Sequence, residues 1–519
     1  MKRQKSLVGQ GLFLSFVAIM ASILSFAKEA IFANYFGVSE IADAYTVAIQ
    51  VPEILFAVVW ESINAVVIPL YTEKLHNEGK KGANRFISNF FSIVGLICIL
   101  FVALGEIFTA AVVKVTSPGL SDTAHALAVD LMRWVLPVLI FEGVIRVATG
   151  VLNVHKQFVV PKILTTVRNI GVIVFLVAFS SRFGVFAAAF GFLCGIAIEC
   201  VLCYLTMLKN ERFSLYVNFK DPFLIKAGRM AVPLIIGIGI NELNQIADKI
   251  IASFLIAGSI SSLNYASKLS SIIHGLLLSN VITIMYPTFS RLAAEGDREK
   301  LTETFVKTVR IAIMLCVPII FGGIFLRQEI VSIAFMRGAF DQASVDQVSV
   351  LFSYYLATTF FVTVNSIGVK VFTSCYDTKT PAVISSIGVV INIALNIVLA
   401  IYLGVVGLVI ATLISSAIVT IACLIVVHKK IYKYKITPIF SALGQSVLCG
   451  VLMMVVLILI KTIVFTGVDV SSVLMKIVYS LVAVVCGVIV YGVSLIVFRA
   501  EETNAIRSRI ARILHRKKR

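Results

Sequence analysis

Charged side chains that interrupt otherwise apolar stretches are the feature of this sequence that points to chemistry. Lys28, Lys249 and Lys268 each lie within a long and mostly apolar segment. An ionisable group at the depth of a lipid bilayer costs about 2.5–3.5 kcal/mol, so it is expected to face a polar cavity or a charged partner. Ammonium groups that converge on a desolvated cleft attract an anion, and one pyrophosphate would satisfy three lysines. The sequence therefore predicts a cationic cleft for an anionic substrate.

Local ion pairs are the alternative explanation for these deep cations. Six of the 45 Lys and Arg residues lie at depth: Lys28, Arg133, Arg146, Lys249, Lys268 and Lys370. Pairing of Lys28 with Glu29 is disfavoured because adjacent residues point to different sides of a helix. The same argument applies to Lys249 and Asp248.

Pairing between helices stays open, for example of Lys268 with Asp43 or Glu61. These two carboxylates complete the predicted substrate-binding set with the lysines at 28, 249, 268 and 370.

Other polar residues at depth are candidates for ion coupling. The carboxylates are Asp43, Glu53, Glu61, Glu242 and Asp248. Asn392 and Asn396 lie one helical turn apart and could supply oxygen atoms to Na⁺ together with Asp248 and Thr412. Hydrogen bonding between helices is the simpler explanation for the two asparagines, and their spacing alone favours it. Na⁺ or H⁺ is thus the candidate coupling ion, and no cofactor is expected.

The sequence lacks the motifs of common enzymes. It contains no hydrolase triad, phosphate-binding loop or metal-ligand spacing. Cys200 and Cys203 form a CxxC pair, but they lie within an apolar span without a second pair or a histidine cluster. We expect them to be buried bystanders. The chain is predicted not to be an enzyme.

The elements that position these residues are long apolar helices. Hydrophobic residues make up 59% of the chain and charged residues 14%, far from the composition of a soluble domain. A helix needs about 20 apolar residues to cross a bilayer. The predicted spans are 12–36, 41–72, 86–113, 124–150, 160–180, 184–208, 222–257, 261–290, 303–326, 348–374, 381–402, 404–427, 440–465 and 472–498.

The distribution of Lys and Arg sets the predicted topology. With a cytoplasmic N-terminus, most cations fall on the cytoplasmic side, and this group includes Arg168 and Arg310. The outer connections hold four: Lys114, Arg182, Arg327 and Arg337. Because cytoplasmic loops retain Lys and Arg, both termini are expected in the cytoplasm. The net charge of +18 then needs no nucleic acid, and the basic tail is expected to contact anionic lipids.

An internal repeat relates two parts of the chain. A shift of about 220 residues places Lys28 on Lys249, Gly37 on Gly258 and Pro161 on Pro381. Six spans separate the copies, and an even number keeps their orientation parallel. We expect an all-α polytopic membrane protein of about 14 transmembrane helices, with two six-helix halves in a parallel pseudo-twofold repeat and two extra C-terminal helices. The predicted domains are 1–215, 216–435, 436–498 and a basic cytoplasmic tail at 499–519.

Several runs resemble the MurJ/MviN family of lipid II flippases, within the superfamily that also contains multidrug and polysaccharide exporters. They are Phe26–Glu29, Ala42–Ala44, Gln245–Leu269, Arg337–Asp341, Asp377–Pro381 and the Asn392/Asn396 pair. The likeness covers essentially the whole chain. It implies a carrier that flips the undecaprenyl-pyrophosphate-linked peptidoglycan precursor from the inner to the outer leaflet of the bacterial cytoplasmic membrane.

The resemblance also implies cavity arginines that bind pyrophosphate, and this chain departs from that pattern. Ser22 and Lys28 stand at the two arginine positions of the first helix, and Lys249, Lys268 and Lys370 stand at the later ones. Lysine keeps the charge but lacks the bidentate fork that matches phosphate. The family's Na⁺ site falls on Asp248, Asn392, Asn396 and Thr412, although a carboxylate is common where Asn396 stands.

The leading hypothesis is therefore a lipid II flippase for cell-wall synthesis that works by alternating access. The alternatives are a flippase for another lipid-linked polysaccharide repeat, a multidrug antiporter and a non-transporting scaffold. A cationic cleft disfavours the antiporter because it repels cationic drugs. The expected partners are the lipid-linked precursor, membrane lipids and, at the outer loop 327–347, proteins of cell-wall synthesis.

Overall fold

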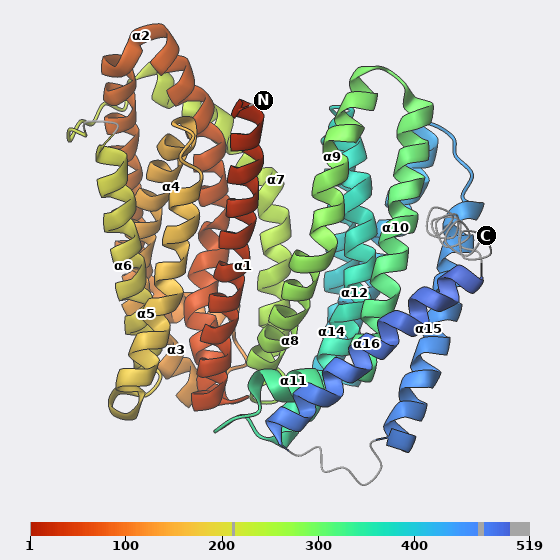
Figure 1. The fold of residues 1–519 in the computed structure, drawn as a ribbon. Coiled ribbons are helices and arrows are strands. Elements are labelled where there is room, and N and C mark those ends of the chain that lie inside the picture. Colours follow the sequence, from red (N-terminus) through yellow and green to blue (C-terminus); the bar gives the residue numbers. More distant parts are fainter. Residues whose placement is uncertain (1, 210–212, 465–471, 499–519) are drawn as a thin grey trace. The chain divides into compact units, whose positions relative to one another are not determined.

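The computed structural model describes residues 2–209, 213–464 and 472–498, and the predicted basic tail at 499–519 lies outside them. Helices without any strand make up the regular structure of this described part (Figure 1). Ten of its helices are long and apolar enough to cross a membrane, or eleven if one bent pair counts as a span. The prediction of an all-α polytopic membrane protein is confirmed.

The chain divides into two compact units. Unit 1 comprises residues 1–264 and 337–341, and unit 2 comprises residues 265–336 and 342–519. The helices up to the end of unit 1 are α1 (Lys2–Phe36), α2 (Glu40–Thr116), α3 (Asp122–Val135), α4 (Val138–Val154), α5 (Val159–Phe183), α6 (Phe186–Leu208), α7 (Pro222–Ser253) and the start of α8 (Ser259–Ile273).

Unit 2 takes the rest of α8 and the helices that follow. They are the π-helical turn η1 (His274–Leu278), α9 (Ser279–Ala294), α10 (Arg298–Phe325), α11 (Arg327–Phe335), α12 (Gln342–Ser374), α13 (Lys379–Leu403), α14 (Val405–Lys430), α15 (Thr437–Val464) and α16 (Val473–Val497). Packing thus places α7 in unit 1, whereas the repeat predicts a domain boundary between residues 215 and 216. That boundary stays a prediction, since repeat and packing are different criteria.

The segment labelled α2 agrees with the second and third predicted spans, because its two helical stretches are separated by a break at Gly79, where φ is 67°. Two other elements differ from the predicted spans. The fourth span is split into α3 and α4, which are bent by 43°. The outer loop predicted at 327–347 contains the short helix α11. Hydropathy locates apolar segments, but it does not distinguish a kink from a loop.

The backbone confirms the internal repeat independently of residue identity. Lys156 and Tyr376 are non-glycine residues with positive φ, 61° and 59°, in the turns that precede α5 and α13. Gly184 and Gly404, after those two helices, have φ of 55° and 56°. The same turn conformation therefore recurs about 220 residues later.

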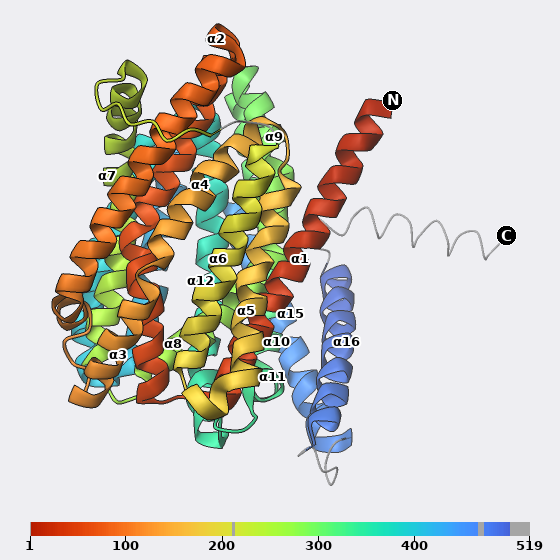
Figure 2. The same cartoon turned by 90° about the vertical axis from the view of Figure 1, so that its left-hand side faces the viewer.

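Unit 1 is built around the long helix α2. This helix packs against α3, α4 and α7, while α5 packs along α6 and α1. Figure 2 shows α5 and α6 running side by side. Ser39 caps the start of α2, where its hydroxyl accepts a hydrogen bond from the Ala42 N–H at 3.3 Å. The arrangement brings polar positions of α2, α4, α5 and α6 into one region.

Unit 2 holds the two extra C-terminal helices against α10 and α11. Tyr491 of α16 donates its hydroxyl to the Met314 carbonyl oxygen at 3.1 Å. Lys476 donates to the Ser332 hydroxyl at 2.6 Å, and Lys461 lies 3.5 Å from the Glu329 carboxylate. These contacts fix α15 and α16 to unit 2, although they stand outside the repeat.

Candidate functional site

Asp43 of α2 has a structural partner within unit 1. Its side chain is buried, and its two carboxylate oxygens accept the backbone N–H groups of Gly258 at 2.7 Å and Ser261 at 2.6 Å. Free N–H groups at the start of a helix carry partial positive charge, which a carboxylate satisfies. Asp43 therefore caps α8 rather than standing open to a substrate.

Lys249 of α7 lies in a short polar chain that reaches α2. Its ammonium group donates to the Gln50 side-chain oxygen at 2.5 Å, and Gln50 donates in turn to Asn264 at 2.8 Å. The hydrogen-bond partner of the ammonium group is thus a neutral amide, and the carboxylates of Asp248, Glu53 and Asp43 act on it electrostatically. A role of Lys249 in substrate binding stays a prediction.

Lys28 forms an ion pair with its neighbour Glu29, although the sequence argues against this pair. Its ammonium nitrogen lies 3.0 Å from Glu29 Oε1, and both side chains are largely buried. Adjacent Cβ atoms do point to different sides of a helix, but the four-carbon lysine stem is long enough to curve back to its neighbour. The prediction that this pair would not form is wrong, and Lys28 has a partly neutralised charge.

Two further lysines of the predicted set belong to unit 2. Lys268 of α8 is half-buried and has no ion pair or hydrogen bond in the described part of the chain. Lys370 of α12 has its ammonium nitrogen 5.0 Å from the centre of the Tyr286 ring, at cation–π distance. Glu61 belongs to unit 1, where its side chain is exposed. The meeting of lysines from both halves in one cleft stays a prediction.

The proposed Na⁺ ligands divide between the units. Asn396 donates to Asn392 Oδ1 at 2.9 Å, and Asn392 donates to the Thr412 hydroxyl at 3.4 Å and to Ser415 at 3.1 Å. This network of α13 and α14 is the hydrogen bonding between helices that the spacing favours. It offers neutral oxygen atoms only, while Asp248 belongs to unit 1. Binding of Na⁺ at these residues would therefore need a carboxylate from outside unit 2.

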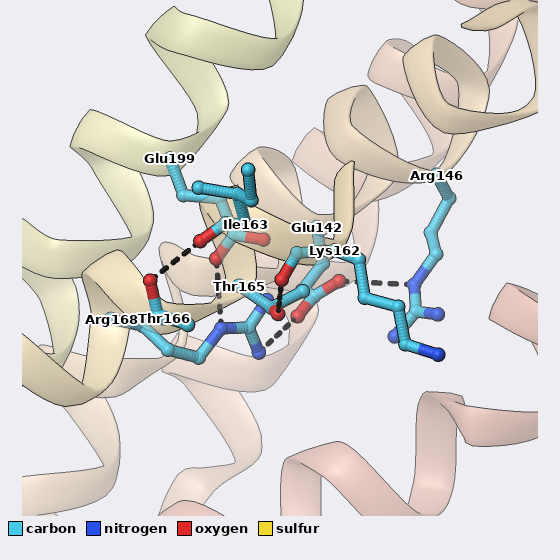
Figure 3. A network of polar contacts seen from close by, with 8 residues as sticks. All are labelled: Glu142, Arg146, Lys162, Ile163, Thr165, Thr166, Arg168 and Glu199. Atoms are coloured by element: carbon cyan, nitrogen blue, oxygen red, sulfur yellow. Dashed lines mark hydrogen bonds and ion pairs between the residues drawn. The ribbon is translucent and has the colours of Figure 1, made fainter. Parts of the chain in front are cut away.

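A buried charged network in unit 1 contains only one of the residues that the sequence singled out at depth, Arg146 (Figure 3). Arg168 of α5 binds two carboxylates: Nη1 lies 2.8 Å from Glu142 of α4, and Nε lies 2.9 Å from Glu199 of α6. Glu142 also accepts Arg146 Nε at 3.1 Å. The side chains of Glu142 and Glu199 are 7% and 0% exposed. Three helices are joined here by ion pairs.

The charge count places Arg168 among the cytoplasmic cations, but the structure places it within a helix, where it is paired with carboxylates. The residue lies near the middle of α5, where its side chain is 18% exposed. Arg310 of α10, placed in the same group, is also buried. Charge counting gives each cation to the nearer loop and ignores carboxylates on other helices. Glu142 and Glu199 also lie within predicted spans. A carboxylate at such a depth is the sequence signal that a cationic partner on another helix is needed.

The network borders a cavity of about 250 Å³ within unit 1. Its charged lining comes from Glu53 and Glu61 of α2, Glu142 and Arg146 of α4, and Arg168 of α5. Trp60 and Phe192 contribute apolar walls. The cavity lining includes Glu61, which the sequence predicts to bind substrate, and Arg146, which the sequence identifies as a deep cation.

The fold is that of a polytopic helical membrane protein. It matches an inward-facing multidrug resistance MATE family transporter of the MOP superfamily, with TM-score 0.68 and 11% identity over 79% of this chain and 95% of that one. It also matches a lipid II flippase MurJ in an inward closed conformation, with TM-score 0.81 and 23% identity over 95% of this chain and 100% of that one.

A model of the family described as "Lipid II flippase MurJ" matches residues 32–479, and this chain belongs to that family. A probable lipid II flippase MurJ of Rickettsia prowazekii is 26% identical over 88% of this chain and 90% of its own length. One of Aquifex aeolicus is 26% identical over 72% of this chain and 74% of its own length. The resemblance drawn from the sequence runs is confirmed.

Proposed function

We propose that this chain is a lipid II flippase, which moves the undecaprenyl-pyrophosphate-linked peptidoglycan precursor from the inner to the outer leaflet for cell-wall synthesis. The observation that carries the proposal is the family match across residues 32–479, which includes nearly all of the helices. Membership of a flippase family confirms the prediction of a transporter rather than an enzyme. The chain is a multi-pass membrane protein, and we place both termini in the cytoplasm from the Lys and Arg distribution.

The deep cations supply the chemistry that an anionic head group requires. Lys268 has no neutralising partner in the described residues, and Lys249 is held by a neutral amide. An anion gains most from lysine side chains at such a depth, where water screens charge weakly. Lys28 contributes less, because Glu29 already lies 3.0 Å away. We therefore assign pyrophosphate binding chiefly to Lys268 and Lys249.

Transport by alternating access follows from the repeat. Two halves that are related by an axis along the membrane normal can rock against each other and expose a site between them to either side. The charged head group would travel through the protein while the polyprenyl chain stays in lipid. Membrane potential or a gradient of Na⁺ or H⁺ is the proposed driving force, and no step is assigned to a bound ion.

A flippase for another lipid-linked polysaccharide repeat is the second candidate. The observation that favours it is the use of lysine where bidentate arginine would match a pyrophosphate better. The multidrug transporters share the fold at 11–15% identity, which carries no argument about substrate. The extracellular end around α11 is the surface we propose for partners in wall synthesis.

Complementation of a flippase-depleted bacterium tests the proposal. We expect Lys268→Ala and Lys249→Ala to fail, whereas Lys114→Ala, an exposed lysine of the predicted outer side, should support growth. Mass spectrometry of the lipid that copurifies with the protein distinguishes lipid II from other lipid-linked glycans. Full growth of the Lys249→Ala/Lys268→Ala double variant would contradict the assigned binding residues. Copurification of a different glycan would contradict the substrate.

A further inference from the structure

A histidine lies in the middle of the apolar stretch that forms α8, η1 and α9. These three elements make one unbroken run of helix from Ser259 to Ala294, and His274 is the first residue of the π-helical turn between the two α-helices. A histidine within a membrane span is rare and is by default a functional residue, often one that relays protons. His274 belongs neither to the pyrophosphate-binding lysines nor to the ion-pair network of unit 1.

His274 lies on the side of its helix that packs against other helices of unit 2. One turn earlier, Ser270 forms a buried hydrogen bond of 2.9 Å between its hydroxyl and that of Thr359 of α12. Residues four apart share a face of a helix, and the turn η1 itself contacts α10 and α12. The Nε2 atom of His274 is enclosed there and has no hydrogen-bond partner in the part of the chain that the structure describes. An enclosed ring nitrogen without a partner is costly, because it has lost water and gained nothing in return.

The surrounding helices offer no carboxylate to balance a charged ring. Acidic residues are absent from 265–294 of α8 and α9, from 304–325 of α10 and from 347–374 of α12. The other ionisable residues of these stretches are Tyr265, Lys268, Tyr286, Arg291, Lys307, Arg310, Cys316, Tyr354, Tyr355 and Lys370. Those that carry charge at neutral pH are all cations. The site against α12 therefore has no group that would compensate a protonated His274.

The π-helical geometry of η1 gives this site a means to move. A π-turn holds one residue more than an α-turn and occurs frequently at functional sites within helices. Return of η1 to α-helical geometry would rotate α9 relative to α8 by about 100°, the angle that one residue adds. Gly275 lies in the turn, where an added Cβ would meet open space, and glycine weakens an α-helix by about 1 kcal/mol. Gly275 thus lowers the preference of this turn for the α-helical geometry.

We propose that His274 is the proton-binding site of the flippase, and that η1 couples its protonation to a movement of α9. The inference rests on the proposed function and names the ion that drives it. The imidazole takes up H⁺ from water on the outer side. The imidazolium, which has no counter-charge against α12, leaves that place as η1 changes its geometry. Release of H⁺ to the cytoplasm restores the neutral ring, so that one proton moves inward for each lipid that moves outward.

The distribution of lipid II between the leaflets of proteoliposomes tests this exchange. The probe is NBD-labelled lipid II, which dithionite bleaches only in the outer leaflet, and equal K⁺ with valinomycin holds the membrane potential at zero. A gradient of about one pH unit is worth a factor of about ten in the distribution of a lipid that is exchanged for one proton. With the exterior more acidic by that amount, we expect the wild type to enrich lipid II in the outer leaflet by up to about tenfold. His274→Gln should leave the two leaflets equally filled.

His76→Gln is the matched control, because it removes an exposed histidine from α2, and it should behave as the wild type. Hydrogen–deuterium exchange of residues 270–285 in detergent follows the turn without any transport. At about pH 5.5 the wild type should exchange faster there than His274→Gln, and at about pH 8 the two should agree. Comparison at equal pH removes the intrinsic effect of pH on exchange. Thermal unfolding of each variant confirms that it is folded.

The outcomes distinguish this inference from the proposed function. If the wild type equilibrates lipid II but the pH gradient does not shift it, or if His274→Gln still follows the gradient, the proton assignment is overturned while flippase function stands. If His274→Gln moves no lipid, hydrogen exchange decides: a difference from the wild type that is confined to acid pH supports the assignment, and equal exchange at both pH values overturns it. If the wild type moves no lipid II, the proposed function itself fails and takes this inference with it.

Discussion

Gly119 donates its backbone N–H to the Ser253 hydroxyl across 3.0 Å, which joins the loop after α2 to the C-terminal end of α7. The repeat reproduces this contact at the end of α1, where the Ala339 N–H donates to the Asn34 carbonyl oxygen at 2.9 Å. Both contacts lie within unit 1, because residues 337–341 pack there. Each half of the repeat thus sends a loop to the first helix of the other half.

Glycine is required in both of these loops. A Cβ at Gly119 would lie 2.5 Å from the Ser253 carbonyl oxygen, and one at Gly338 would lie 2.3 Å from the Asn34 carbonyl oxygen. Gly338 also has φ of 54°, a conformation that costs other residues about 1–2 kcal/mol. Overpacking adds about 1–3 kcal/mol. We expect Gly338→Ala to lower the thermal unfolding temperature in detergent, and Gly119→Ala to lower it less.

Gly95→Ala provides the control for these two variants. Gly95 lies inside α2 at a position where an added Cβ would meet open space. Alanine also favours a helix over glycine by about 1 kcal/mol. An unfolding temperature for Gly338→Ala as high as that of Gly95→Ala would show that the loop does not approach α1 closely.

The sequence predicts the helical architecture because apolar length and the bias of Lys and Arg are local properties. The repeat can also be found, since Gly and Pro at equal offsets mark equal turns. The partners of charged residues cannot be found in this way. Glu142, Arg168 and Glu199 come from three helices, and only packing shows that they meet. Asp43 resembles a substrate ligand in the sequence because the start of α8, which it caps, is distant along the chain.

The cap on α8 gives a second prediction. Asp43→Asn retains the size of the side chain but replaces one accepting oxygen by an NH₂ group that faces a backbone N–H. Loss of such a cap costs about 0.5–2 kcal/mol, and a buried unsatisfied donor adds to it. We expect a lower unfolding temperature in the absence of any substrate. Asp130→Asn, at an exposed position of α3, should leave it unchanged. Equal temperatures for the two variants would contradict a capping role.

The ion-pair network gives a third prediction. Arg168→Gln leaves Glu142 and Glu199 without their shared guanidinium, and removal of one partner from a buried pair costs about 3–5 kcal/mol. The variant should unfold at a much lower temperature than Arg182→Gln, which removes an exposed arginine from the same helix. Similar unfolding of the two variants would mean that the network contributes little to stability. A triple variant that combines Arg168→Gln with Glu142→Gln and Glu199→Gln has no unpaired buried charge in this network. Its unfolding temperature should therefore be higher than that of Arg168→Gln alone.

The turn before α13 gives a prediction about pH. Asp377 accepts the ammonium group of Lys430 at 2.6 Å, and Thr380 donates to it through its hydroxyl at 2.6 Å and its N–H at 3.0 Å. These contacts lower the pKa of Asp377 from 3.8 to about 2. The hydrogen bond from Lys430 makes the largest contribution. Because the folded carboxyl binds its proton less tightly than the unfolded one, its contribution to stability is complete above about pH 4 and is lost as the pH falls towards 2.

Asp377→Asn should therefore cost stability at neutral pH and cost progressively less below about pH 4. The unfolding temperatures of wild type and variant, measured in detergent from about pH 6 to about pH 2.5, should converge at the acid end. The effect at neutral pH is expected to be small, about 1 kcal/mol or less, because the Lys430 side chain is 54% exposed and water and salt screen the pair. Lys429→Gln, which removes a neighbouring exposed charge, should follow the wild-type curve. A constant difference between wild type and Asp377→Asn across this range would show that Asp377 acts through its shape and not through its charge.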